Sequence, residues 1–207
     1  MHRILSNFLV LEGLDGSGTT TQTSLLAERV ASMGISVRAE AEPTDGPVGQ
    51  LIRRYLHSSD DVDSDTFALL YAADRNEHLN GPNGIVSQAT DRLVISDRYF
   101  LSSLAYQSVE SGLDFVRALN DRFPWPELTL FVDLPVERCL ERLSSRKALD
   151  RFETRERLDR VYSRYHEEVE TYAKGGGRIE VVNGDAPEGE VFEALWSHIT
   201  EMPIFKP

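Results

Sequence analysis

The sequence predicts an α/β fold, a three-layer α/β/α sandwich around a central, about five-stranded parallel sheet. Short apolar runs have the length expected of strands that are covered on both faces. Segments with helical periodicity separate these runs, so strands and helices alternate along the chain. A glycine-rich turn directly follows the first run. The expected strands span residues 8–11, 35–39, 93–96, 128–132 and 179–182, and the first of them is an unbroken apolar run.

The first forty residues form a strand–loop–helix–strand unit. A helix is expected over 20–33, where apolar residues recur on one face and Gly34 follows the last of them. The segment 40–49 is rich in proline and glycine and predicts a loop. This loop leaves the second strand at its carboxyl end, where open α/β sheets bind ligands.

Helical patterns fill most of the remaining chain. Ser64 or Asp65 is expected to cap the helix over 66–79. Further helices are expected over 51–56, 84–90, 101–112, 113–123, 135–143, 153–173 and 189–199.

Composition limits the class of protein. A length of 207 residues predicts one domain, 1–207. A net charge of −12 disfavours a nucleic-acid or anionic-membrane partner. The first residues resemble neither a signal peptide nor a membrane span, so we expect no membrane partner. The one cysteine, Cys139, has no internal disulfide partner and favours a reducing, cytoplasmic compartment.

The glycine-rich turn has the spacing of a P-loop. Residues 13–20 read G-L-D-G-S-G-T-T, against the pattern G-x-x-x-x-G-K-[ST]. Glycines at 13, 16 and 18 let the backbone approach phosphate oxygens. Thr20 offers a hydroxyl to magnesium, and Asp97, at the end of the third strand, has the position of a Walker B carboxylate. Thr19 stands where the lysine is expected.

Four motifs in order resemble the thymidylate kinase family: LEGLDGSGTTTQ, LLYAADR at 69–75, Asp97-Arg98-Tyr99 and RKALDR at 146–151. The resemblance covers nearly the whole chain. It implies a nucleoside-monophosphate-kinase-like domain that moves the γ-phosphoryl group of ATP onto dTMP by direct in-line transfer, with ATP and Mg²⁺ bound. It also implies a homodimer and a lid segment at about 142–155.

The resemblance assigns roles to acceptor-site residues. Asp15 would accept a hydrogen bond from the deoxyribose 3′-hydroxyl, Tyr71 would stack on thymine, and Arg75 would bind the base. Arg98 would hold the acceptor phosphate, with Arg53 as a second contact. Ser103 matches a base-contacting position, and Tyr106 matches an aromatic residue near the 2′ position. These acceptor-site residues are Asp15, Arg53, Tyr71, Arg75, Arg98, Ser103 and Tyr106.

The resemblance also implies a donor site. Lid arginines of the bacterial type match Arg142, Arg146 and Arg151, and Arg146 and Arg151 join Asp15 and Arg98 as expected catalytic residues. Magnesium would be held by Thr20 and Asp97. The residues expected to bind ATP are Gly13, Gly16, Ser17, Gly18, Thr19, Thr20, Thr21 and Arg142.

Two positions depart from the family pattern. Thr19 replaces the lysine, which leaves three accounts: a protein that only binds nucleotides, a substitute cation such as Lys147, or a site in which backbone, magnesium and lid arginines suffice. Ala41 stands where many members have the arginine of Arg-Glu-Pro, so one acceptor-phosphate or structural contact is missing. We expect an active kinase.

Three alternatives remain. The first is a kinase for another deoxynucleoside monophosphate. The second is a nucleotide-binding homologue that is catalytically impaired because of Thr19. A general P-loop hydrolase is disfavoured because it does not explain an aromatic residue four positions before an arginine, nor the lid.

Overall fold

The computed structural model describes residues 2–58, 62–144 and 154–206. Within these residues, five parallel strands form one sheet in the order β2-β3-β1-β4-β5. The predicted α/β fold with a central parallel sheet is therefore confirmed. The strands are β1 (Ile4–Gly13), β2 (Val37–Ala41), β3 (Leu93–Asp97), β4 (Trp125–Asp133) and β5 (Ile179–Asn183).

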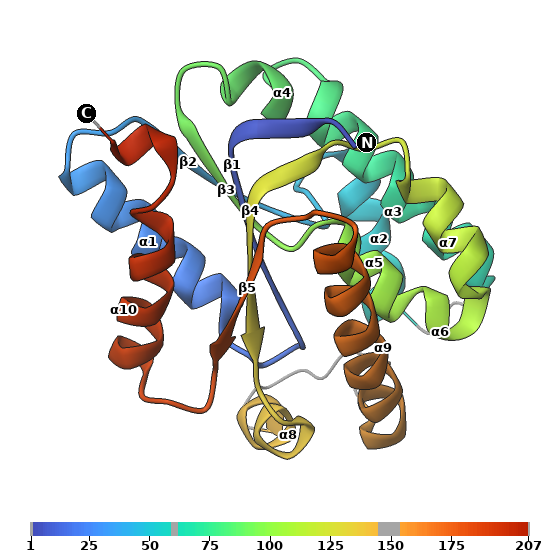
Figure 1. Cartoon of the computed structure of the whole chain (residues 1–207). Helices are drawn as coiled ribbons and strands as arrows, with labels where there is room; N and C mark the ends of the chain where they lie inside the picture. The colour runs from blue at the N-terminus through green and yellow to red at the C-terminus, as the bar shows by residue number, and fades with distance from the viewer. Residues whose placement is uncertain (1, 59–61, 145–153, 207) are drawn as a thin grey trace.

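Helices cover both faces of the sheet and complete the three layers. α1 and α10 lie on one face, and α3, α5, α7 and α9 lie on the other (Figure 1). Among the described helices, none has the length and apolar composition needed to cross a membrane. The α-helices are α1 (Thr19–Ser32), α2 (Pro47–His57), α3 (Ser64–Asn80), α4 (Ile85–Gln88), α5 (Phe100–Tyr106), α6 (Ser108–Ser111), α7 (Leu113–Asn120), α8 (Val136–Ser144), α9 (Arg155–Lys174) and α10 (Glu188–Ile199), and a 3₁₀ helix spans Pro203–Phe205.

The central strand β1 is buried on both faces. Phe8 and Val10 pack into the core shared with α3, α5 and α9. Leu9 and Leu11 pack into the opposite core, shared with α1 and α10. Successive side chains of a strand point to opposite faces, so burial on both faces requires an unbroken apolar run.

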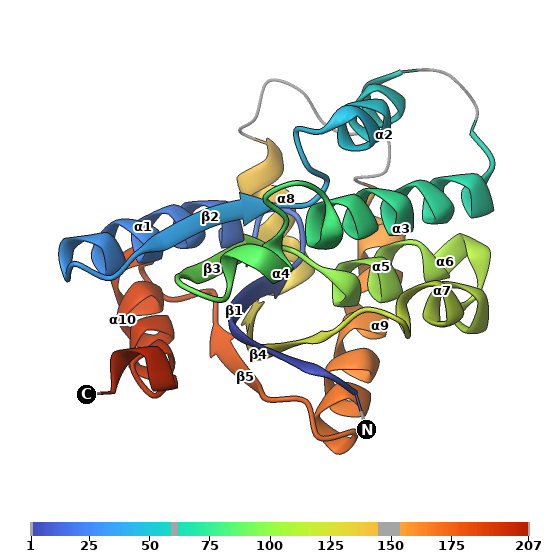
Figure 2. The ribbon, with the colours of Figure 1, turned by 90° about the horizontal axis from the view of Figure 1, so that it is seen from above.

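Parallel pairing brings the functional loops to one edge of the sheet. Leu11 of β1 and Ala41 of β2 both pair with Asp97 of β3. Gly13 pairs with Val132 of β4. The glycine-rich turn and the segments that follow β2 and β3 therefore leave the sheet side by side. In the view from above, α2 and α3 lie beyond the end of β2 (Figure 2). A ligand site is expected at this edge.

Some element boundaries differ from the sequence expectations. β1 and β4 are longer than expected, because each continues at its amino end through residues without a continuous apolar pattern. The helix expected over 101–112 is α5 and α6, separated by a turn at Gln107. The expected cap at Ser64 or Asp65 is wrong. α3 already begins at Ser64, so Asp63 is the cap, and its Oδ1 accepts hydrogen bonds from the N–H groups of Asp65 and Thr66.

Candidate active site

The glycine-rich turn joins β1 to the amino end of α1. Gly16 and Gly18 have φ angles of 87° and 100°, a left-handed conformation that side chains disfavour. A Cβ on Gly16 would also lie 2.9 Å from the carbonyl oxygen of Cys139 on α8. The first N–H groups of a helix have no intrahelical acceptor, and they favour an anion. This local structure suits a polyphosphate.

A hydroxyl and a carboxylate meet beside the turn. Thr20 Oγ1 donates to Asp97 Oδ2 at 2.5 Å. Asp97 Oδ1 is buried and accepts no hydrogen bond from the described residues. Such oxygens are ligands that Mg²⁺ prefers, and Mg²⁺ usually combines one or two carboxylates with water and phosphate oxygens. The described ranges contain no group of three or more His, Cys, Asp or Glu side chains placed to hold a metal ion. Thr20 and Asp97 thus fit a magnesium ion that shares its coordination with a nucleotide.

Arg98 reaches from the end of β3 across to the glycine-rich turn. Its φ of 73° is left-handed, which in a non-glycine residue costs about 1–3 kcal/mol. Its N–H donates to the carbonyl of Leu11 at 2.8 Å. The guanidinium Nη2 lies 2.7 Å from Asp15 Oδ1, and Nη1 donates to the hydroxyl oxygens of Ser102 and Tyr165 at 3.0 and 3.3 Å. These contacts fix the guanidinium beside the glycine-rich turn of residues 13–20, here called the phosphate loop.

Glu12 supports this arrangement from beneath, and the sequence reasoning did not identify it. Its carboxylate is fully buried and accepts hydrogen bonds from Tyr99 N–H, Ser102 N–H, Ser102 Oγ and Tyr165 Oη at 2.6–3.2 Å. Burial raises the pKa of Glu12, although Ser102, the nearby Arg98 and Tyr165 act in the opposite direction. The available signal was an acidic residue that ends an apolar strand.

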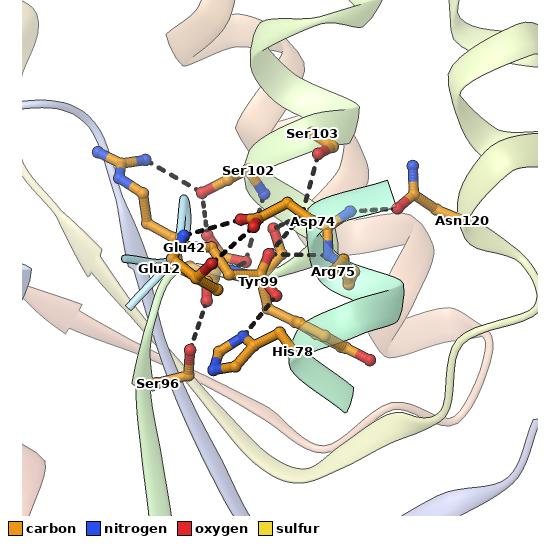
Figure 3. A network of polar contacts seen from close by, with 12 residues as sticks. Glu12, Glu42, Asp74, Arg75, His78, Ser96, Tyr99, Ser102, Ser103 and Asn120 are labelled. Atoms are coloured by element: carbon orange, nitrogen blue, oxygen red, sulfur yellow. Dashed lines mark hydrogen bonds and ion pairs between the residues drawn. The ribbon is translucent and has the colours of Figure 1, made fainter. Parts of the chain in front are cut away.

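Arg75 is a second arginine of the site and lies inside the protein. Its side chain is 1% exposed, so it is not a solvated charge. Nε donates to Glu42 Oε2 at 2.9 Å, and Nη2 donates to the Tyr99 carbonyl and to Ser103 Oγ, both at 3.1 Å. Nη1 donates to Asn120 Oδ1 (Figure 3). The guanidinium orientation is therefore set from four sides.

Glu42 carries this network to a histidine. Burial alone would raise the pKa of Glu42, but Arg75 and His78 outweigh burial and lower it. His78 Nδ1 lies 3.1 Å from Glu42 Oε1, and His78 Nε2 lies 3.7 Å from Glu40 Oε2. Burial alone would lower the pKa of His78, but the two glutamates raise it to about 9. Protonated His78 thus completes a buried cluster of alternating charge (Figure 3).

A cavity of about 360 Å³ connects Arg75 to Arg98. Its lining comes from the loops after β1, β2 and β3 and from α1, α2, α3, α5 and α9, so tertiary folding brings most predicted acceptor-site residues together. Predicted residues in the lining are Asp15, Thr20, Arg53, Tyr71, Arg75, Asp97, Arg98 and Tyr106.

Ser103 is the predicted acceptor-site residue that does not line this cavity. Its hydroxyl is buried and accepts from Arg75, so in this structure it holds the arginine. Ser102, one position earlier, does line the cavity. A direct contact between Ser103 and a base stays a prediction.

Tyr71 and Arg53 line the cavity from α3 and α2. Tyr71 is half-buried, and its ring meets Phe67 edge-on at 5.2 Å between centroids. Arg53 Nη2 donates to the Pro43 carbonyl and lies 3.6 Å from Asp45. Its Nε is buried and has no hydrogen-bond partner among the described residues. One donor of Arg53 is therefore unsatisfied among the described residues.

Two features lie where the sequence analysis expects the donor nucleotide. Thr19 is buried and uncharged where the P-loop lysine was expected. Arg142 of α8 donates from Nη1 to the carbonyl oxygens of Gly16 and Ser17 at 3.3 and 3.2 Å, and from Nη2 to that of Gly184 at 3.1 Å. A guanidinium therefore lies against the phosphate loop. Arg146, Lys147 and Arg151, and most of the expected lid, lie outside the described residues.

Several cavity-lining residues were missed by the sequence reasoning. Tyr99 and Glu42 belong to motifs that the sequence analysis considered without giving them a role, and the others lie outside those motifs. The proximity of Glu42 to Arg75 or of Arg157 to Tyr106 depends on tertiary structure. The missed lining residues include Glu42, His57, Phe67, Tyr99, Ser102, Gln107 and Arg157.

Comparisons with known proteins identify related chains. Residues 11–194 match the family model described as Thymidylate kinase. A protein of Aeropyrum pernix named "Putative thymidylate kinase" is 43% identical over 203 residues, covering 90% of this chain and 96% of the relative. A Treponema pallidum protein of the same name is 42% identical over 144 residues, covering 69% of each chain. A Pyrococcus horikoshii protein named "Probable thymidylate kinase" is 43% identical over 147 residues, covering 67% of this chain and 70% of the relative.

Proposed function

The chain belongs to the thymidylate kinase family, and we propose that it transfers the γ-phosphoryl group of ATP directly to dTMP, yielding dTDP and ADP, with Mg²⁺ as cofactor. One observation carries this proposal. One cavity is lined by an aromatic ring and a buried arginine, Tyr71 and Arg75, and by a second arginine, Arg98, whose guanidinium lies 2.7 Å from Asp15 of the phosphate loop. A nucleotide's base and phosphate need such separate surfaces.

The acceptor's orientation follows from these groups. The base lies against Tyr71, with the buried Arg75 as a fixed hydrogen-bond donor. The phosphate faces Arg98, which contacts the phosphate loop, and Arg53, a second cation that lines the same cavity. The sugar then passes Asp15 and Tyr106, whose backbone N–H and hydroxyl are joined at 2.9 Å.

The donor nucleotide occupies the phosphate loop. Backbone N–H groups of residue 16 and of residues 18–21, at the amino end of α1, bind its β- and γ-phosphates. The hydroxyls of Ser17 and Thr21 are further donors, since Ser17 Oγ is buried without a partner among the described residues and Thr21 is exposed in the first turn. Arg142, against Gly16 and Ser17, supplies a cation there. Magnesium would be held by Thr20 and Asp97 and would neutralise negative charge on the phosphate oxygens.

The reaction needs positioning more than proton transfer. The attacking group is a phosphate oxygen of dTMP, which is already anionic near neutral pH, so no general base is required. Arg98 reduces the repulsion between two anionic nucleotides, and Asp15 keeps its guanidinium in place. The arginines at 146 and 151, in the proposed lid at about 142–155, are expected to stabilise the transferring phosphoryl group and exclude water.

Thr19 keeps a second candidate function in view. A buried, uncharged side chain at the lysine position removes one phosphate contact. Loss of one positioned donor in a comparable site costs about two to three orders of magnitude in rate. An impaired, nucleotide-binding homologue is therefore the alternative, as is a kinase for another deoxynucleoside monophosphate.

A coupled ADP-release assay tests the proposal. ATP–magnesium is supplied with dTMP, with each of four other common nucleoside monophosphates, or without an acceptor. We expect turnover with dTMP well above the acceptor-free rate and above the other acceptors. ATP binding by calorimetry without turnover selects the impaired homologue, and preference for another deoxynucleotide selects that kinase.

We also infer a homodimer of single-domain chains, supported by the family relationship. Sedimentation equilibrium tests this, and a mass near 23.3 kDa at micromolar concentration would contradict it. A cytoplasmic location is supported by Cys139, which is free and buried. Its pKa is raised to about 12 by burial, so the thiol stays protonated.

A further inference from the structure

Arg157 lines the acceptor cavity from α9, far along the chain from the motifs that mark the site. Its side chain is 15% exposed. Thr154 caps α9 and accepts a hydrogen bond from the Arg157 N–H at 3.4 Å, which fixes the start of this side chain. The position thus combines a defined backbone with a cation at the cavity wall.

The contacts of Arg157 converge on Tyr106. Nη2 donates to the Tyr106 carbonyl at 3.4 Å, and the guanidinium carbon lies 5.8 Å from the centre of the Tyr106 ring. Glu110 holds the same guanidinium through two further hydrogen bonds of 3.4 Å. A cation within about 6 Å of an aromatic centroid is attracted by the ring. Arg157 therefore holds both the backbone and the ring of Tyr106.

Tyr106 is also tied to the phosphate loop. Its hydroxyl accepts a hydrogen bond from the Asp15 N–H at 2.9 Å. The Arg98 guanidinium carbon lies 5.2 Å from its ring centre, so two arginines act on one ring. Tyr106 lines the same cavity as Arg75 and Arg98, so in the proposed orientation of the acceptor its ring is available to contact the sugar.

We propose that Arg157 is a positioning residue that holds the Tyr106 ring against the acceptor's sugar and thereby sets the preference for deoxyribose over ribose. The inference rests on the proposed function for the orientation of the acceptor. A displaced ring leaves room for a 2′-hydroxyl, whereas a held ring crowds it. Loss of Arg157 must therefore lower the ratio of kcat/KM for the deoxyribose acceptor to kcat/KM for the ribose acceptor.

The chain offers a matched control. Arg160 lies one helical turn further along α9, and its Nη2 donates to the Val109 carbonyl at 2.8 Å. This contact also joins α9 to the α6 segment, but Arg160 does not line the cavity. Arg157→Gln and Arg160→Gln each remove one cross-helix arginine, and only the first acts on Tyr106.

The experiment compares dTMP with ribothymidine 5′-monophosphate, which differ only in the 2′-hydroxyl. For wild type and both variants, kcat/KM is measured for each acceptor, and Kd is measured by calorimetry. We expect Arg157→Gln to reduce the deoxyribose preference at least about fivefold, with Arg160→Gln near wild type. In Tyr106→Ala, adding Arg157→Gln should reduce the preference no further.

Three results would overturn the inference: equal affinity of wild type for both sugars, an unchanged ratio in Arg157→Gln, or an equal change in both arginine variants. The Kd ratio separates this outcome from failure of the proposed function. A chain that shows no turnover can still bind dTMP more tightly than ribothymidine 5′-monophosphate. If that difference in Kd depends on Arg157, the result supports the inference and rejects the kinase.

Discussion

The guanidinium Nη2 of Arg98 lies 2.7 Å from Asp15 Oδ1, which joins the end of β3 to the phosphate loop. Asp15 thus has two tasks in the proposed site: it orients Arg98, and it accepts a hydrogen bond from the acceptor's 3′-hydroxyl. A carboxylate between two phosphate-binding glycines repels phosphate, and the ion pair with Arg98 offsets this repulsion.

The 3′-hydroxyl contact is tested with Asp15→Asn and with 3′-deoxy-dTMP. We expect each change alone to lower kcat/KM by about tenfold or more, because each removes a charge-assisted hydrogen bond. Combining them should cost much less than the product of the two effects. Fully multiplicative losses would show that Asp15 acts through Arg98 alone.

Thr19→Lys tests whether the phosphate loop depends on threonine. If the native loop lacks only a cation, restored lysine should raise kcat by about a hundredfold. We expect an increase below tenfold, because Arg142 already lies against Gly16 and Ser17. Thr19→Ser is the control, since it keeps the hydroxyl and adds no charge. A hundredfold gain would contradict our expectation and mark the native enzyme as impaired.

The proposed magnesium site makes Asp97 and Thr20 unequal partners. Asp97→Asn removes a charge, and we expect at least about a hundredfold lower kcat/KM with a raised magnesium requirement. Thr20→Ser keeps the hydroxyl and should stay within about threefold of wild type, whereas Thr20→Val should not. Activity is titrated against free magnesium at fixed ATP. An unchanged magnesium dependence in Asp97→Asn would remove this residue from the site.

His78 makes stability depend on pH. Its pKa in the folded protein is about 9, above the ordinary histidine value of 6.5, because Glu40 and Glu42 favour the charged imidazole; protonation therefore favours the folded state. The stabilisation is fully present below about pH 6.5, on the order of 3 kcal/mol, and is lost as pH rises to about 9. Urea unfolding of wild type and His78→Gln should differ most at pH 6 and least at pH 9.5.

His198→Gln, in the last turn of α10, is the control for this effect. Its difference from wild type should not follow the same pH course. A His78→Gln difference that grows between pH 6 and 9.5 would show that the neutral, not the protonated, histidine is favoured by folding.

Local sequence determined the fold class and the phosphate loop. Alternating apolar runs and helical stripes specify strands and helices through local geometry, and Gly16 and Gly18 are required by left-handed backbone at their own positions. Asp97 was identifiable because it ends an apolar strand, and parallel strands end at the same edge of a sheet.

Tertiary structure alone decided how the charges are shared. Glu12 and Tyr165 are 153 positions apart and meet at 3.0 Å. Glu42 holds Arg75 from 33 positions away, and Arg157 reaches Tyr106 across 51. The periodicity of the sequence does not indicate such pairs, because it reflects only local geometry. Buried charges are tolerated only where the folded chain supplies their partners. The sequence therefore determined which chemical groups enter the site, and packing decided which of them face the acceptor and which hold the others in place.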